Sequence, residues 1–270
     1  MATLDLSLPH ALPTAGENVA AFIDAWTMMT SRFPGHRIAA DGGVATTFSN
    51  TPLPFLNIST LDRPLTDPGA FRHALCEARA RAADCGHGTM LALSGDWAPR
   101  DWEDLAAETG WLRSMALTAM AADRLRPPRR AEAALDFRAI DDPATARDLG
   151  LVNALAYAMP VEAFDCLGEM ALWRDGGFGI VGYDEGRPVT GGAAFAVGGM
   201  IYVAMVASAP GTHGRGYAEA AMRRIILDAE RAVGGRRIWL HATETGEPLY
   251  RSMGFEGGAA LTLLHLASGA

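Results

Sequence analysis

A glycine-rich turn between an apolar run and an amphipathic run carries the clearest chemical signal in the sequence. Residues 200–207 are apolar and partly β-branched, as in a buried strand, and apolar residues recur at helical spacing from Ala218 to Val233. The turn between them reads Pro-Gly-Thr-His-Gly-Arg-Gly-Tyr over residues 210–217. Such a turn offers backbone N–H groups and the positive end of a helix to an anion, and glycine permits close approach. We therefore expect it to bind a phosphate or a pyrophosphate.

This turn resembles the acyl-CoA-binding motif of the GNAT superfamily of N-acetyltransferases, which follows a strand with the pattern Gln/Arg-x-x-Gly-x-Gly/Ala. Here the pattern runs from His213 to Ala218, and His213 replaces the usual Gln or Arg. A second segment, Pro-Leu-Tyr-Arg-Ser-Met-Gly-Phe over residues 248–255, is similar to the Leu-Tyr-x-x-x-Gly-Phe ending of the superfamily. The two motifs stand in the family's order, and the resemblance covers the chain from about Leu135 onward.

The resemblance implies a mixed-sheet α/β (α+β) fold, acetyl-CoA as cosubstrate and direct attack of an amine on the thioester. It assigns protonation of the leaving thiolate to Tyr250, whose phenol can donate a hydrogen bond to sulfur. It places the thioester oxygen and the pantetheine at the splayed end of the strand before the turn. The residues that it assigns to acyl-CoA are Val206, Ala207, Ser208, His213, Gly214, Arg215, Gly216, Tyr217, Ala218 and Thr243.

The general base is left open between several residues. An alkylammonium group with a pKa of ~10.4 must lose a proton before it can attack. Glu244 and His241 lie at the end of the strand expected over residues 237–242, and Glu169 lies on a helix expected over residues 161–173. We favour Glu244 and then His241, whose alternative role is to pack against the sheet. The pair starts on a strand and so lacks the one-face helical geometry of a metal motif, and we expect no metal.

Composition narrows the function further. The net charge of −8 argues against a nucleic-acid-binding surface. The sequence contains no apolar run of 18 residues, so we expect no membrane span. Three cysteines and the lack of a signal peptide favour a cytoplasmic protein. All 23 basic residues are arginine, which excludes a lysine Schiff base and a Walker-A loop. The expected partner is a small-molecule or peptide amine; aminoglycosides, polyamines, amino acids and protein N-termini stay open, as does a homodimer.

The order of predicted elements suggests two related halves. Prolines and arginines over residues 124–130 predict a linker, so we expect domains at 1–126 and 135–270 joined by 127–134. The first half repeats the element order of the second, with a strand at 53–59 and a capped helix at 101–109, but lacks the glycine turn. We interpret the chain as a tandem GNAT-like acyl-CoA N-acyltransferase fold whose first half has lost its CoA motif. The alternative for this half is an unrelated α/β domain.

Two other functions are consistent with parts of this pattern. A non-catalytic acyl-CoA-binding sensor would need the glycine turn but no base. A dinucleotide-binding oxidoreductase would use Gly214 and Gly216, but position 219 is Glu rather than Gly and no repeated βαβ halves follow. We therefore favour an N-acetyltransferase over the sensor, and both over the oxidoreductase.

Overall fold

A computed structural model describes residues 12–129, 131 and 133–267. The first half contains α1 (Ala15–Thr30), β1 (Arg37–Asp41), β2 (Val44–Phe48), η1 (Pro54–Leu56), β3 (Asn57–Leu61), α2 (Pro68–Ala83), β4 (Met90–Leu93), η2 (Gly95–Trp97), α3 (Trp102–Glu108) and β5 (Trp111–Ala122). The second contains β6 (Asp136–Ala139), α4 (Pro143–Tyr157), η3 (Val161–Gly168), η4 (Met170–Trp173), β7 (Gly177–Asp184), β8 (Arg187–Val197), β9 (Met200–Ser208), α5 (Tyr217–Val233), β10 (Arg237–Ala242), α6 (Glu247–Met253) and β11 (Glu256–Leu266). Within the predicted linker, Arg130 and Glu132 lie outside the described residues.

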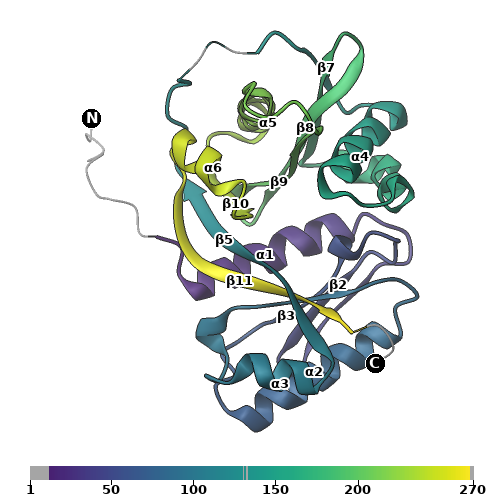
Figure 1. The fold of residues 1–270 in the computed structure, drawn as a ribbon, viewed down its shortest axis with the longest axis vertical. Coiled ribbons are helices and arrows are strands. Elements are labelled where there is room, and N and C mark those ends of the chain that lie inside the picture. Colours follow the sequence, from purple (N-terminus) through teal and green to yellow (C-terminus); the bar gives the residue numbers. More distant parts are fainter. Residues whose placement is uncertain (1–11, 130, 132, 268–270) are drawn as a thin grey trace.

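The described strands form one mixed sheet in the order β1-β2-β3-β4-β11-β5-β10-β9-β8-β7-β6. Most neighbours are antiparallel, whereas β3 with β4 and β9 with β10 run parallel. The helices cover its two faces, which confirms the predicted mixed-sheet α/β (α+β) class (Figure 1).

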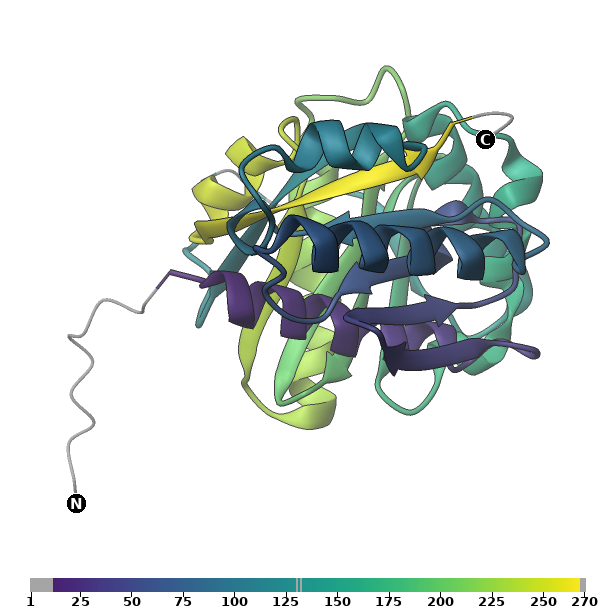
Figure 2. The ribbon, with the colours of Figure 1, turned by 90° about the horizontal axis from the view of Figure 1, so that it is seen from below.

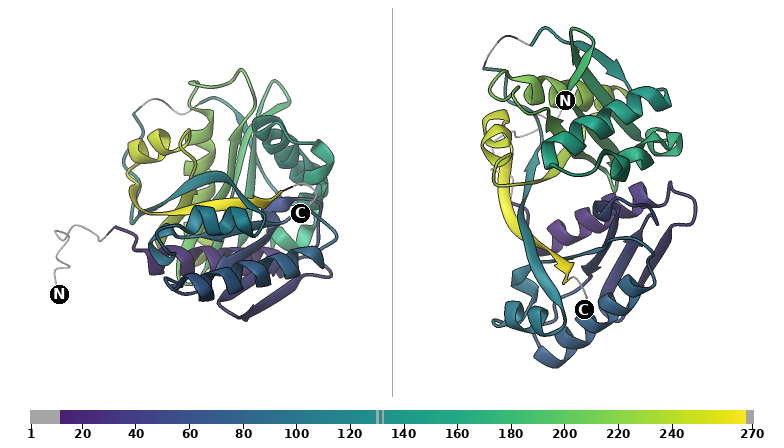
Figure 3. Two further views of the ribbon diagram at one scale, coloured as in Figure 1. Left: turned by 60° about the horizontal axis from the view of Figure 1, so that its bottom comes forward. Right: turned by 45° about the vertical axis from the view of Figure 1, so that its right-hand side comes forward.

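The two halves exchange their last long strands. β5 comes from the first half but pairs with β10 of the second, with Met120 opposite Leu240. β11 ends the second half but pairs with β4 of the first, with Leu263 opposite Ala92. The two exchanged strands also pair with each other along most of their length and run from one half to the other (Figure 3). Each half therefore completes the sheet of the other.

Alternating side chains along the strands form cores on both faces of the sheet. In the first half, Leu91 and Leu93 of β4 pack under α2 and α3 (Figure 2), and Met90 packs with α1 on the other face. In the second half, Ile201 of β9 packs under α5, whereas Tyr202 packs against α1. α1 therefore packs both in a core of the first half and in a core of the second half, and it fixes the two halves to each other.

Local sequence signals explain most element boundaries. Thr14 and Glu17 form a capping box at the start of α1, and each side chain bonds the other residue's backbone N–H. Glu185 and Gly186 both have positive φ between β7 and β8, as a two-residue type I′ hairpin turn requires. Glycine takes the second of these positions without strain.

Three sequence expectations differ from the structure. The helix expected over 161–173 consists of two 3₁₀ segments, because Glu169 turns to an extended backbone and caps η4 with its own carboxylate. The strand expected over 53–59 begins only at Asn57, since Pro54 starts a 3₁₀ turn. The helix at 102–108 is present, but no described side chain caps its N-terminus at Asp101.

Candidate functional site

A notch forms where β9 and β10 separate. Their parallel pairing ends at Val203 and Leu240. Just beyond, β9 holds one extra residue relative to β8, and Met205 takes a left-handed backbone with φ 55°. Such a bulge bends a strand away from its neighbour. The buried amide of Asn153 on α4 donates to the Met205 carbonyl at 3.1 Å, which holds the bulge in place.

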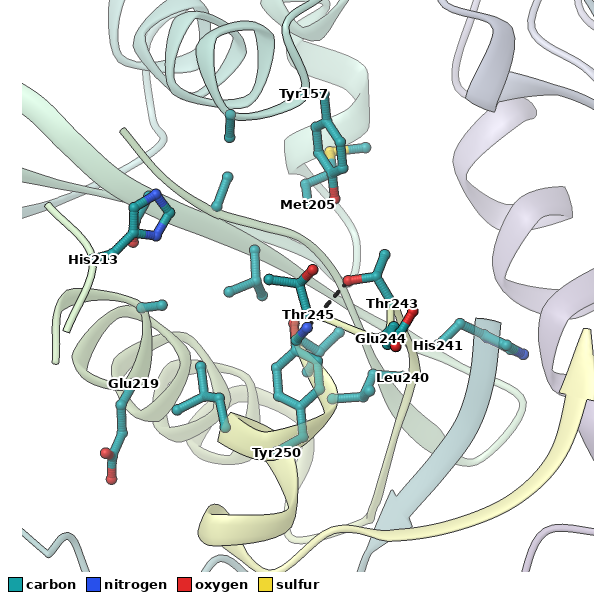
Figure 4. A pocket seen from close by; sticks show the side chains of 18 of the residues that line it. Tyr157, Met205, His213, Glu219, Leu240, His241, Thr243, Glu244, Thr245 and Tyr250 are labelled. Carbon is teal, nitrogen blue, oxygen red and sulfur yellow. Dashed lines mark hydrogen bonds between the residues drawn. The ribbon is translucent and has the colours of Figure 1, made fainter. Parts of the chain in front are cut away.

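A cavity of about 1080 Å³ occupies this notch and continues to the glycine turn. It brings together twelve of the thirteen residues predicted from the sequence: Val206, Ala207, Ser208, His213, Gly214, Gly216, Tyr217, Ala218, His241, Thr243, Glu244 and Tyr250. Figure 4 shows several of these side chains around the cavity. Arg215 does not line it: its guanidinium lies over the Tyr217 ring and 3.8 Å from Asp184.

The N-terminus of α5 opens into the cavity. Gly216 is its N-cap, with φ 78°, and no described side chain caps the helix there. The other three long helices, α1, α2 and α4, are each capped by a side chain. In α2, which follows the equivalent strand of the first half, Asp67 accepts the N–H of Ala70 at 2.8 Å. The protein's own carboxylate therefore fills the anion position of α2, whereas no described side chain occupies that of α5.

Tyr250 lies in the cavity wall on α6. Its ring packs edge-on against Phe255, with ring centroids 6.1 Å apart, and lies against the backbone of Gly246. Burial raises the pKa of the Tyr250 phenol, so the hydroxyl carries its proton at neutral pH. The cavity wall therefore contains a protonated phenol, which can donate a hydrogen bond.

His241 is bound on both ring nitrogens. Nε2 lies 2.6 Å from the amide oxygen of Asn18 on α1, and Nδ1 lies 2.5 Å from the hydroxyl of Tyr202. Because an amide oxygen only accepts, Nε2 carries the hydrogen and Nδ1 accepts from the tyrosine. Burial lowers the pKa of His241 to about 3. The neutral imidazole thus links the two halves, and so weak a base has little tendency to take a proton from an alkylammonium.

Glu244 is exposed at the cavity wall, in the turn between β10 and α6. The turn is closed by the N–H of Gly246, which bonds the Thr243 carbonyl at 3.0 Å and the Thr243 hydroxyl at 3.2 Å (Figure 4). These bonds fix the turn that leads from β10 into α6, the helix that holds Tyr250. Glu169 does not line this cavity.

Several cavity residues were not predicted from the sequence. Arg113 and Met115 come from β5, and Tyr157 ends α4 opposite Tyr250. Figure 4 shows Tyr157 and Tyr250 on opposite sides of the cavity. The β5 residues reach the site only through the strand exchange, for which the sequence contains no signal. The position of Tyr157 had a weak signal in the sequence, because Pro160 favours the end of the preceding helix shortly before it.

Membrane and metal features are absent from the described part of the chain. None of its helices is long and apolar enough to cross a bilayer. Nor do its His, Cys, Asp and Glu side chains form a group of three or more that could hold a metal ion.

Comparisons with known proteins agree with this geometry. Residues 152–255 match the profile of the Acetyltransferase (GNAT) family. No curated protein matches the sequence significantly. Among solved structures, the chain resembles a GCN5-related N-acetyltransferase from Kribbella flavida, at 18% identity and TM-score 0.68 over 96% of this chain and 98% of that one. It also resembles a tandem GNAT protein from the clavulanic acid biosynthesis pathway, at 15% identity and TM-score 0.52 over 96% and 98%.

A third structure, a GNAT-family protein from Novosphingobium aromaticivorans named as a putative acetyltransferase, matches at 19% identity and TM-score 0.55 over 94% of this chain and 100% of that one. At these identities the likeness shows the fold, and the profile match shows the family of the second half. We conclude that residues 152–255 belong to the GNAT acetyltransferase family, within a chain that has the tandem GNAT-like fold.

Proposed function

We propose that the protein is an N-acetyltransferase that transfers the acetyl group of acetyl-CoA to an amine by direct attack. One observation carries the proposal: a single cavity joins the N-terminus of α5, which no described side chain caps, the separated strands β9 and β10, and the protonated phenol of Tyr250. In the proposed complex, the pyrophosphate of CoA lies at residues 213–218. The pantetheine runs along Val206–Ser208 and Thr243 towards Tyr250.

The alkylammonium first releases one proton through Glu244 to solvent. From the neutral amine onward, the proposed chemistry needs one proton to leave nitrogen and one to reach sulfur. The neutral amine attacks the thioester carbonyl carbon, a C–N bond forms and the C–S bond breaks. Glu244 takes the proton that the amine loses, and Tyr250 gives its proton to the departing thiolate and regains one from solvent. We assign the base to Glu244 rather than to His241, because both nitrogens of His241 are already bonded. His241 then acts by positioning β10 against α1.

We also propose that residues 1–126, 127–134 and 135–270 are the sequence units of this tandem fold. Their strand exchange means that the site draws on both: β5 belongs to the first unit and lines the cavity of the second. Asp67 at the start of α2 supports the view that the first unit binds no CoA of its own.

The first test is Tyr250→Phe, measured by thiol release from acetyl-CoA. The substitution removes one proton donor and almost no volume, so CoA affinity should stay within about twofold. The transfer rate should fall roughly 10- to 1000-fold, the range for losing a positioned acid. The deficit should shrink with an acyl donor whose leaving thiol is more acidic.

Tyr183→Phe is the matched control, because it removes a hydroxyl that bonds Asp148 in a core away from the cavity. It should leave the transfer rate unchanged. Wild-type turnover by Tyr250→Phe, under conditions where chemistry limits the rate, would remove Tyr250 from the mechanism. Tight CoA binding with no thiol release towards any amine class would favour the acyl-CoA sensor instead.

A further inference from the structure

A second, smaller cavity of about 130 Å³ adjoins the first. The two share wall residues at the bulge and at the cavity mouth, among them Tyr157, Met205 and Thr243. A molecule whose reactive end lies at the thioester in the large cavity can therefore extend its other end into the small one.

The walls of the small cavity come from both halves of the chain. The first half contributes large apolar side chains from α1, from the segment before β3 and from β5: Trp26, Met29, Leu53, Phe55, Leu56 and Met115. The second half faces them with Phe164 and the bulge of β9. The first half, which carries no glycine turn, thus forms much of this wall.

Most polar side chains in the wall are bonded to the protein itself; the Tyr157 hydroxyl, on the wall shared with the large cavity, makes no hydrogen bond to a described residue. The Trp26 indole N–H donates to the Phe55 carbonyl at 2.6 Å. The Asn153 amide donates to two backbone carbonyls, and Tyr202 donates to His241. These groups have little left to offer a polar ligand, so the wall behaves as an apolar surface.

The wall of the small cavity also lacks charged side chains. No Asp, Glu or Arg is found among the described residues that line the small cavity. A second ammonium group, or a carboxylate, would lose its water there without gaining a partner, which is costly. The volume fits a benzene-sized group, since an apolar cavity of ~150 Å³ is known to bind benzene.

We propose that the acceptor is a primary amine with a single charge and a compact apolar body, an arylalkylamine or a similar alkylamine, whose body occupies the small cavity. This rests on the proposed function of the large cavity. It disfavours polyamines, aminoglycosides and free amino acids, which carry further charges next to the reacting amine.

The test compares four amines with acetyl-CoA: 2-phenylethylamine, ethylamine, 1,4-diaminobutane and phenylalanine. Acetyl-CoA binding is measured separately by calorimetry. We expect kcat/KM for 2-phenylethylamine to exceed that of each of the others at least about tenfold. Ethylamine and 1,4-diaminobutane lack the ring, whose burial is worth more than ~1.4 kcal/mol, and phenylalanine carries a carboxylate that the apolar wall cannot pair.

Two variants test the wall. Phe55→Ala shortens a half-buried ring of the small cavity and should lower kcat/KM for 2-phenylethylamine about tenfold while ethylamine changes little. Phe178→Ala is the matched control, since Phe178 is also half-buried but packs in the core under α5. Met115→Glu places a carboxylate on the wall that both cavities share, and should raise kcat/KM for 1,4-diaminobutane about tenfold.

The outcomes separate the two proposals. This inference would be overturned if the protein binds acetyl-CoA but its kcat/KM for ethylamine, 1,4-diaminobutane or phenylalanine equals or exceeds that for 2-phenylethylamine. It would also be overturned if the protein binds acetyl-CoA but does not acetylate 2-phenylethylamine. Either result would leave the proposed CoA site unaffected. Absence of acetyl-CoA binding would overturn the proposed function and this inference with it.

Discussion

Replacing Gly216 by valine tests whether α5 binds the pyrophosphate. Gly216 has φ 78° and its added Cβ would meet open space, so the fold has room for the side chain but the backbone is strained. Left-handed backbone costs an ordinary residue ~1–2 kcal/mol. Gly199, in the two-residue turn between β8 and β9 at the opposite end of β9, has φ 79° and equally open surroundings. Gly199→Val therefore carries a similar strain at a distance from the cavity.

This strain should lower the melting temperature of both variants by a similar amount, roughly 2–8 °C. Only Gly216→Val places a side chain where, in the proposed complex, the pyrophosphate approaches the helix. Losing one charge-assisted hydrogen bond of ~1.5–3 kcal/mol corresponds to roughly a 10- to 150-fold loss of CoA affinity. Calorimetric titration with CoA, on proteins shown to be folded by thermal melting, measures the difference. Equal CoA affinities in the two variants would refute the placement of the pyrophosphate at α5.

Two further substitutions test the elements around the proposed acid and base. Gly246→Ala would put a Cβ 3.0 Å from Cε2 of Tyr250. The displaced ring should lower the transfer rate, measured by steady-state kinetics, roughly 3- to 30-fold at unchanged CoA affinity. The control Gly235→Ala, whose added Cβ meets open space, should leave the transfer rate unchanged. His241 has a folded-state pKa of about 3, below the ~6.5 of the unfolded chain, so its stabilising effect is complete above pH 6.5 and lost as pH falls. Wild type should therefore lose about 2 kcal/mol more between pH 7.5 and 5 than His241→Gln in urea unfolding, and equal losses would contradict the buried neutral imidazole.

Local patterns in the sequence were sufficient for most elements and for the motif. Helical spacing from Ala218 to Val233 predicted α5, and apolar runs predicted β9 and β10. Where a backbone had two competing choices, the prediction was wrong: residues 161–173 read as one helix by spacing, but Glu169 bonds the backbone two residues on and breaks it.

The glycine turn was recognisable because its function depends on backbone conformation, which residue type controls directly. The charge state of His241 was beyond the sequence, since it depends on burial between the halves, where Asn18, 223 residues away in the chain, bonds the ring. The base assignment and the restriction on the acceptor both follow from such distant contacts.

By itself, the sequence determined the order of helices and strands, the glycine turn at the start of α5 and the resemblance to a family, because each depends on residues close together in the chain. Only the tertiary structure decided that β5 and β11 exchange places, that α1 bonds His241, and that the first half forms an apolar wall beside the notch. These features depend on which strand edges pair and which faces pack. Many pairings satisfy the same apolar pattern, and the choice among them is made by the packing of the whole chain.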